Sequence, residues 1–333
     1  WNGCTPTDLV FPFFLFAVGN ALSFVVEKTG NSRLMLQKIF KRTILIFLIG
    51  LLLNWFPFVR WDSDVLVFKD LSKLRIMGVL QRIAFAYCGG ALITYFFKPK
   101  TAFFIALGLL FSYWGILTAF GDLTLEGNAV RKLDLLVFTE NHLYKGYESK
   151  ILGKNIAFDP EGLLSCMPAI ASVIFGFLAG KFIQTFGKTD FMLRRFIIAG
   201  IVLITSGLLW NLVFPINKPI WSGSYVFYTT GWAMLLLSII FYVVEILKID
   251  GWAEFFLVFG RNPLFIFVLS GVWVKLYALI RIGEVGFYSW FYKTGFQPLL
   301  GNYPGSLAFA IFHVLLFWLI GLALHRQKIY IKV

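Results

Sequence analysis

The sequence has few charged residues, few cysteines and no flexible linker, and each shortage excludes a class of protein. Only 14% of the 333 residues are charged and 59% are hydrophobic, more apolar surface than a soluble domain of this length can bury. Cys4, Cys88 and Cys166 lack CxxC or other metal-ligand spacing, which predicts small buried side chains and no metal site. No Gly/Ser-rich tract divides the chain, so we expect one membrane domain over 1–333.

Long apolar runs make up most of the chain. Nine segments approach the ~17–25 apolar residues that a helix needs to cross a bilayer. They are 9–26, 43–59, 76–97, 101–120, 163–183, 196–214, 224–247, 264–280 and 306–324. Each is expected to be helical, because a backbone in hydrocarbon must satisfy its own hydrogen bonds. The predicted fold is therefore an all-α, polytopic transmembrane helical bundle.

Basic residues concentrate in alternate connections between these segments. They follow the first, third and fifth segments and the last one, as Lys28, Arg33, Lys38, Lys41, Arg42, Lys98, Lys100, Lys181, Lys188, Arg194, Arg195, Arg326, Lys328 and Lys332. The connections at about 60–75 and 121–162 are balanced or acidic instead. Short basic loops stay in the cytoplasm, which predicts a cytoplasmic C-terminus and an outer Trp1. The same rule explains the net charge of +13 without a nucleic-acid partner.

The chain begins at Trp1, without an initiating Met or a signal peptide. A chain that starts on the outer side implies an earlier span that carried it there from the cytoplasm. We therefore expect about nine visible spans and one more missing at the N-terminal end. The two long outer segments, at about 60–75 and 121–162, are where a non-cytoplasmic substrate would arrive.

The clearest polar site within a span is Gln81–Arg82, in GVLQRIAFAY. Arg82 either snorkels to the outer headgroups or faces inward to bind a carboxylate or an anionic group. We favour the inward orientation, because Gln81 beside it adds a second polar cost. Two other residues stay open at this point. Asp8 either caps the first helix or acts within the bundle, and His313 is either a core residue or a proton relay.

FDPEGLL at 158–164 predicts a helix start. Asp159 is expected at the N-cap, Pro160 at the first helical position and Glu161 in the first turn. These positions account for Asp159 and Pro160 without any function. Glu161, at the mouth of a span, is also suited to act as a base or to bind an ammonium group.

Two further motifs combine turn signals with polar or aromatic groups. NKPIWSGSY at 217–225 predicts a short outer turn, in which the aromatic residues either anchor the chain at the interface or form part of a sugar-binding surface. GRNP at 260–263 interrupts an apolar run. Broken helices at membrane depth tend to line cavities, so Asn262 is a candidate site residue.

The motifs together resemble a known family. WNGCTPTDLVFPFFLF resembles the WNG-x-x-x-x-DLVFP signature of the heparan-alpha-glucosaminide N-acetyltransferase family and its bacterial homologues, part of a wider group of transmembrane acyltransferases. KRTILIFLIGLLL, RIMGVLQRIA, ENHLY, AFDPEGLL, AGK, INKPIWSGSY and IYIKV extend the resemblance in order along essentially the whole chain. The ordered set, rather than any one motif, makes the resemblance specific.

The resemblance implies an N-acetyltransferase that uses cytoplasmic acetyl-CoA and acetylates the nitrogen of an amino sugar or glycan across the membrane. The membrane would here be a bacterial inner membrane, with the acceptor in the periplasm. The resemblance also places the catalytic histidine just upstream of the WNG motif, so this chain is expected to lack it. His142, in ENHLY, matches another family position, and we assign it to substrate binding.

An amine must be neutral to attack a thioester, so the site needs a base and donors for the developing oxyanion. The supporting candidates are Asn2, Asp8, Gln81 and Arg82. The substrate-binding candidates are His142, Asp159, Glu161, Asn217, Lys218, Trp221, Tyr225 and Asn262. Lys38, Lys41 and Arg42 are candidates for the CoA phosphates, although positive-inside topology predicts the same cluster. We expect one polar passage, with residues 1–8 near its outer mouth, and with a lining formed by Gln81, Arg82, the 159–161 helix start, residues around 217–225 and Asn262.

An amino-sugar or related small-solute transporter without acyl transfer is the alternative function. Arg82, Glu161 and His313 would then line the transport route. The sequence has no visible internal repeat, which most secondary transporters have, and this counts against the alternative. A non-catalytic bundle in envelope assembly explains none of the motifs. An apolar bundle is also free to form a homodimer through any lipid-facing side.

Overall fold

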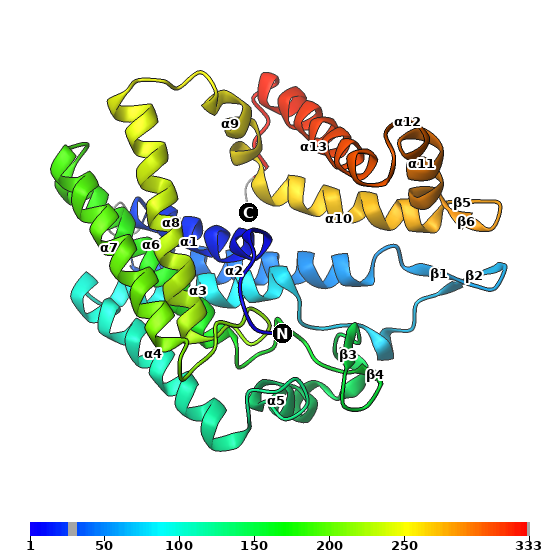
Figure 1. The fold of residues 1–333 in the computed structure, drawn as a ribbon, viewed down its shortest axis with the longest axis horizontal. Coiled ribbons are helices and arrows are strands. Elements are labelled where there is room, and N and C mark those ends of the chain that lie inside the picture. Colours follow the sequence, from blue (N-terminus) through cyan, green and yellow to red (C-terminus); the bar gives the residue numbers. More distant parts are fainter. Residues whose placement is uncertain (26–31, 332–333) are drawn as a thin grey trace. The chain divides into compact units, whose positions relative to one another are not determined.

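The computed structural model describes residues 1–25 and 32–331, and it divides into two compact units. The first unit comprises Trp1–Leu51 and Ser72–Lys248, and the second comprises Leu52–Leu71 and Ile249–Val333. Helices dominate both units, and the strands form three separate two-stranded hairpins (Figure 1). The predicted all-α membrane bundle is confirmed.

The first unit contains most of the long helices. A short 3-10 turn, η1 (Pro6–Leu9), leads into α1 (Val10–Ser23), and α2 (Ser32–Trp55) follows. The remaining helices are α3 (Val79–Phe96), α4 (Pro99–Phe120), α5 (Ala129–Phe138), α6 (Cys166–Phe186), α7 (Asp190–Trp210) and α8 (Gly223–Phe241), the last extended by a π-helical turn, η5 (Tyr242–Ile246). The turn η4 (Glu140–His142) and the antiparallel hairpin of β3 (Tyr147–Ser149) and β4 (Lys154–Ile156) lie between α5 and α6.

Helix α6 is the centre of the first unit and packs against α1, α3, α4 and α8. Its contact with α1 is very close because each helix presents a glycine to the backbone of the other. A Cβ on Gly19 would lie 1.8 Å from the carbonyl oxygen of Val173, and one on Gly176 would lie 2.0 Å from that of Phe16. Such small-residue contacts are a common means of joining helices in membranes, where the hydrophobic effect does not drive them together.

The second unit begins in the last turn of α2. The antiparallel hairpin of β1 (Val59–Asp62) and β2 (Val65–Phe68) follows, then the turn η3 (Leu71–Lys73), which leads back to the first unit. The unit resumes with α9 (Ala253–Arg261), α10 (Pro263–Leu279) and the hairpin of β5 (Arg281–Ile282) and β6 (Val285–Gly286). It ends with α11 (Phe287–Gly295), α12 (Gln297–Leu300) and α13 (Asn302–Arg326).

Seven helices of the described chain are long and apolar enough to cross a membrane, each at a predicted segment. An eighth candidate is the pair α9 and α10, which bends by 80° at the predicted break before Pro263. Segment 43–59 overlaps α2, which ends at Trp55, so the predicted helix extends four residues too far and reaches β1. Helix α2 carries Lys38, Lys41 and Arg42 in its first half and is not among these candidates. Lys28 and Lys332 fall outside the described residues. The sidedness of the bundle stays a prediction.

Candidate functional site

A cavity of about 970 Å³ in the first unit gathers residues from widely separated parts of the sequence. The N-terminal segment forms one wall, and the others come from α3, from the connection before α5, from the β3–β4 region and from two turns. The lining residues are Trp1, Asn2, Gly3, Cys4, Thr5, Asp8, Arg82, Leu123, Thr124, Leu125, Glu126, Tyr147, Glu148, Lys150, Ile151, Pro160, Glu161, Lys218, Pro219 and Trp221. Six of the predicted site residues, including Arg82, therefore line one space.

Arg82 enters this cavity from the first turn of α3, its backbone amide donating to the carbonyl of Gly78 at 3.0 Å. Its side chain is only 1% exposed. One guanidinium nitrogen, Nη2, donates to the carbonyl of Pro160 and to the hydroxyl of Ser165. The guanidinium also stacks on the ring of Trp221, 4.6 Å from its centroid. The predicted inward orientation of Arg82 is confirmed, and these protein contacts exclude snorkelling.

The charge of Arg82 is held by neutral groups. Within residues 1–25 and 32–331, no carboxylate forms an ion pair with it, and its Nε has no hydrogen-bond acceptor. A buried cation without a paired anion carries a desolvation cost that an arriving negative charge reduces. The inner wall of the cavity is therefore suited to an anionic group or to an oxygen that gains negative charge during a reaction.

Asp8 closes the start of the first helix and reaches a second element. Its Oδ2 accepts hydrogen bonds from the backbone amide of Thr5 at 2.8 Å and from the Thr5 hydroxyl at 2.7 Å, which forms a capping box. Its Oδ1 accepts from Lys218 Nζ at 3.1 Å. The N-cap is therefore Thr5, with Asp8 three residues later, and Asp8 combines the two roles that the sequence left open.

Asn217 and Tyr225 fix the N-terminal segment without lining the cavity. Both side chains are fully buried. Asn217 Nδ2 donates to the carbonyl of Trp1 at 3.1 Å and to Asn2 Oδ1 at 2.9 Å, and the Tyr225 hydroxyl donates to the carbonyl of Asp8 at 2.6 Å. The exposed aromatic surface expected for this turn is absent from these positions. Trp221 lines the cavity wall, but it is also buried, between Arg82 and Phe11.

The helix start predicted at FDPEGLL is wrong. Helix α6 begins at Cys166 with Ser165 at its N-cap, and Asp159 lies in a preceding turn. The carboxylate of Asp159 instead binds Arg75, which donates from Nε to Oδ2 at 2.8 Å and from Nη2 to Oδ1 at 2.7 Å. The same Arg75 nitrogen lies 2.5 Å from Glu161 Oε2. Burial alone lowers an arginine pKa, but the hydrogen bonds and charge of Asp159 and Glu161 hold the pKa of Arg75 above its usual range.

Asp134 of α5 lies beneath this turn, although no sequence motif marks it as a site residue. Its Oδ1 accepts from the backbone amide of Leu163 at 2.9 Å, whereas its buried Oδ2 has no partner among the described residues. A Cβ on Gly162 would lie 2.0 Å from that oxygen, so the turn passes directly over the carboxylate. Burial, supported by the charge of Asp159, raises the pKa of Asp134 to about 7. Asp134 therefore supports the segment that carries Glu161.

Five other candidates lie away from the cavity lining. Gln81 is buried against Gly50 of α2, and its Nε2 has no partner in the described chain. His142 Nδ1 lies 2.6 Å from the carbonyl oxygen of Leu74 and so anchors the segment before α3. The cluster Lys38, Lys41 and Arg42 is exposed on α2, where Arg42 lies over the ring of Tyr87. Their functional roles stay predictions.

Asn262 and His313 belong to the second unit. Both ends of the Asn262 amide bind backbone there, donating to the carbonyl of Ile329 at 3.0 Å and accepting from the amide of Ile331 at 2.7 Å. His313 of α13 packs against the ring of Phe309, and its Nδ1 lies 2.8 Å from the Phe309 carbonyl oxygen. The aromatic surroundings favour the interpretation of His313 as a core residue.

The chain is similar to two curated proteins. No family model matches the sequence. The heparan-alpha-glucosaminide N-acetyltransferase of Mus musculus is 29% identical over 324 residues, which cover 80% of this chain and 48% of that protein. The Homo sapiens protein of the same name is 26% identical, with 80% and 47% covered. The chain spans about half the length of these curated relatives and is a distant relative of both.

Proposed function

We propose that this chain forms the membrane core of an N-acetyltransferase. The enzyme would move acetyl from cytoplasmic acetyl-CoA to the amino group of an amino sugar or glycan in the periplasm, across a bacterial inner membrane. The observation that carries the proposal is the convergence of the WNG…D segment, Arg82, Glu161 and Lys218 on one cavity. These positions lie in the motifs on which the family resemblance rests, and they are far apart in the sequence.

The guanidinium of Arg82 is suited to donate hydrogen bonds to the oxyanion that forms during acyl transfer. Attack of an amine on a thioester builds negative charge on the carbonyl oxygen, and fixed donors in a poorly solvated site stabilise that charge most strongly. An arginine stays protonated at every relevant pH. Because Arg82 is held by a carbonyl, a hydroxyl and an aromatic ring, its charge remains available to a substrate oxygen.

The acceptor would bind near the rim of the cavity. Asp8 and Glu161 place carboxylates in its lining, suited to an ammonium group before it loses its proton. Trp1 is 43% exposed, and its indole nitrogen donates to the carbonyl of Leu123 at 2.9 Å. That bond fixes the orientation of an aromatic face, and such a face suits the apolar side of a sugar ring.

The base would come from the sequence before the WNG motif. The resemblance places the family's catalytic histidine there, and Trp1 of the motif itself lines the cavity. A residue just upstream of Trp1 is therefore joined to the cavity wall by a short stretch of backbone. We propose that such a histidine accepts the proton of the attacking amine while Arg82 stabilises the oxyanion.

A second cavity, near the opposite end of α3, is suited to bind the anionic cosubstrate. It measures about 680 Å³ and is lined by Thr94 near the end of α3, Lys100 at the start of α4 and Lys181 on α6. Arg82 and Thr94 are separated by roughly 18 Å along α3, at 1.5 Å per residue. In the described part of the chain the two cavities share no lining residue. We propose that the extended arm of CoA spans the distance between Thr94 and Arg82.

The test uses the full-length protein in proteoliposomes with radiolabelled acetyl-CoA and glucosamine. Arg82→Gln should lower the rate of acetyl transfer by roughly 100-fold or more, as loss of an oxyanion donor typically does. Arg194→Gln is the matched control, because Arg194 is exposed at the start of α7 and should leave the rate unchanged. Full activity of Arg82→Gln would contradict the proposed site. Sugar accumulation without acetylation would instead support the transporter.

A further inference from the structure

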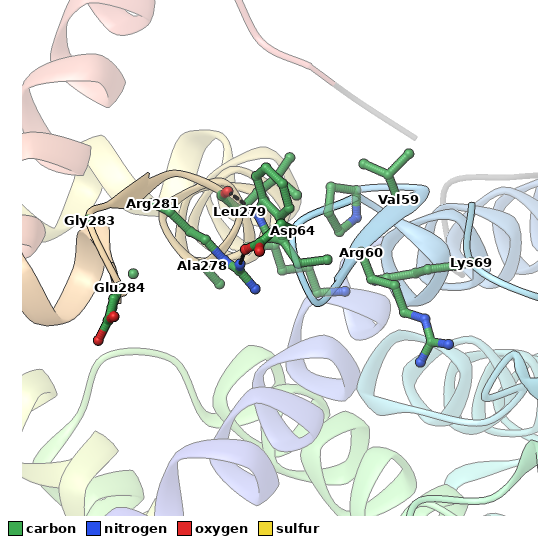
Figure 2. Close-up of a pocket in the computed structure, with 13 residues that line it drawn as sticks. Val59, Arg60, Asp64, Lys69, Ala278, Leu279, Arg281, Gly283 and Glu284 are labelled. Carbon is green, nitrogen blue, oxygen red and sulfur yellow. Dashed lines mark hydrogen bonds and ion pairs between the residues drawn. The ribbon is translucent and has the colours of Figure 1, made fainter. Parts of the chain in front are cut away.

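The second unit has a cavity of about 650 Å³ that the proposed acetyl transfer does not use (Figure 2). It lies between two hairpins, the β1–β2 hairpin that follows α2 and the β5–β6 hairpin that follows α10. The indole nitrogen of Trp61 on β1 donates to the carbonyl of Leu279, the last residue of α10, at 2.8 Å. This hydrogen bond connects the β1–β2 hairpin to the end of α10, and the pocket lies beside it.

The pocket is rich in positive charge. Four cations line it, Arg60, Lys69, Lys275 and Arg281, whereas its acidic residues are Asp64 and Glu284. Asp64 is fully exposed and lies 3.9 Å from Arg281, a distance and exposure at which an ion pair contributes little. The pocket therefore keeps an excess of positive charge.

Carbonyl groups hold three of these cations. Lys69 Nζ donates to the carbonyl of Phe56 at 3.1 Å, Arg281 Nη1 to that of Ser63 at 2.8 Å, and Lys275 Nζ to that of Leu53. At Lys69 the carbonyl orients the cation without neutralising it. Partial burial lowers the pKa of Lys69, because it removes water from the charged amine. A bound anion would supply the missing charge.

The position of the pocket along the chain indicates the source of that anion. Helix α2 ends at Trp55 and α10 at Leu279, each within a few residues of the pocket lining. The ends of apolar helices lie at the level of lipid headgroups, where Trp, Lys and Arg are enriched. Strand β2 also exposes apolar side chains, with Val65 64% and Phe68 82% accessible. Cations beside an exposed apolar strand suit a ligand that has both a phosphate and acyl chains.

We propose that this pocket binds the phosphodiester headgroup of an anionic phospholipid. Lys69 and Arg60 would contact the phosphate, Arg281 would be held in place by the ring of Trp61, 4.5 Å away, and Phe68 would contact the acyl chains. A soluble phosphate would use the cations but not the exposed strand. The inference does not depend on acetyl transfer and is tested without measuring it.

The experiment follows the melting temperature of the purified, delipidated full-length protein. Phosphatidylglycerol should raise it in a concentration-dependent manner, whereas phosphatidylcholine and inorganic phosphate should not. Each basic residue near a membrane surface contributes about fivefold in affinity for anionic lipid, so the double variant Arg60→Gln and Lys69→Gln should bind about 25-fold more weakly. Lys69→Arg keeps the charge and should restore most of the binding.

The matched control is Lys293→Gln, because Lys293 is an exposed cation of the same unit outside the pocket lining. Its affinity for phosphatidylglycerol should equal that of the unmodified protein. Equal stabilisation by inorganic phosphate or by phosphatidylcholine would overturn the proposal. So would unchanged phosphatidylglycerol binding in the single variant Arg60→Gln, which alters only an exposed side chain and should fold normally.

Discussion

Replacing Asp134 by asparagine should remove a pH dependence from the stability of the first unit. Burial raises the pKa of this carboxyl from 3.8 to about 7. Between these two values the folded protein binds a proton that the unfolded chain does not, so the free energy of unfolding falls as the pH rises through this window. The rise in pKa corresponds to about 4 kcal/mol at most. At roughly 2 °C per kcal/mol or less, the melting temperature should fall by up to about 8 °C.

Asparagine suits this test because it resembles the protonated carboxyl. Its Oδ1 can still accept from the Leu163 amide, and no charge is left beneath the turn. Melting temperatures of the purified protein between pH 5 and pH 8 should therefore slope downward for the unmodified chain and stay flatter for Asp134→Asn. Asp62→Asn is the control, since Asp62 is exposed on β1 and should keep the original slope. Parallel slopes for the unmodified chain and Asp134→Asn would refute the reasoning.

Three further predictions concern the site and its orientation. Glu161→Ala in the full-length protein should abolish acetyl transfer with near-normal expression, because Glu161 lines the cavity, and full activity of this variant would show that the site is assigned to the wrong residues. A cysteine placed at the exposed Lys145 should react with an impermeant reagent in intact cells and one at Lys98 should not; the reverse pattern would invert the proposed topology. Asp159→Asn removes one partner of a buried ion pair and should destabilise the protein by about 3–5 kcal/mol in thermal unfolding, whereas an unchanged melting temperature would argue that the pair is dispensable.

The helices were predictable because a bilayer sets a minimum length for an apolar run. The same logic identified the break before Pro263 and the inward direction of Arg82, since a lipid-facing polar group at these places would be costly. The predicted spans were less accurate where cations and an apolar run lie in the same helix. Helix α2 carries its cations within the helix, and no local pattern marks the boundary between the two units.

The site was only partly predictable, because its bonds join residues far apart in the sequence. Asp159 has the local sequence of an N-cap, and nothing nearby indicates that Arg75, 84 residues earlier, takes its carboxylate. Asp134 likewise lies in a charged connection between predicted spans, and its neighbours in the sequence do not indicate burial. Trp221 and Tyr225 have the composition of an exposed interface turn, yet the N-terminal segment and α6 cover them. Local patterns predict helices well, but they do not encode which distant partner a polar side chain will find.

The bend between α9 and α10 is stabilised by residues that follow α13. A helix break leaves backbone groups without their usual partners, and the buried amide of Asn262 at this bend is satisfied by Ile329 and Ile331, past the end of α13. Deleting the residues from Ile329 onward would leave two unmet hydrogen bonds at a buried site, at about 1–3 kcal/mol each. Ile329 and Ile331 are thus a structural part of the second unit.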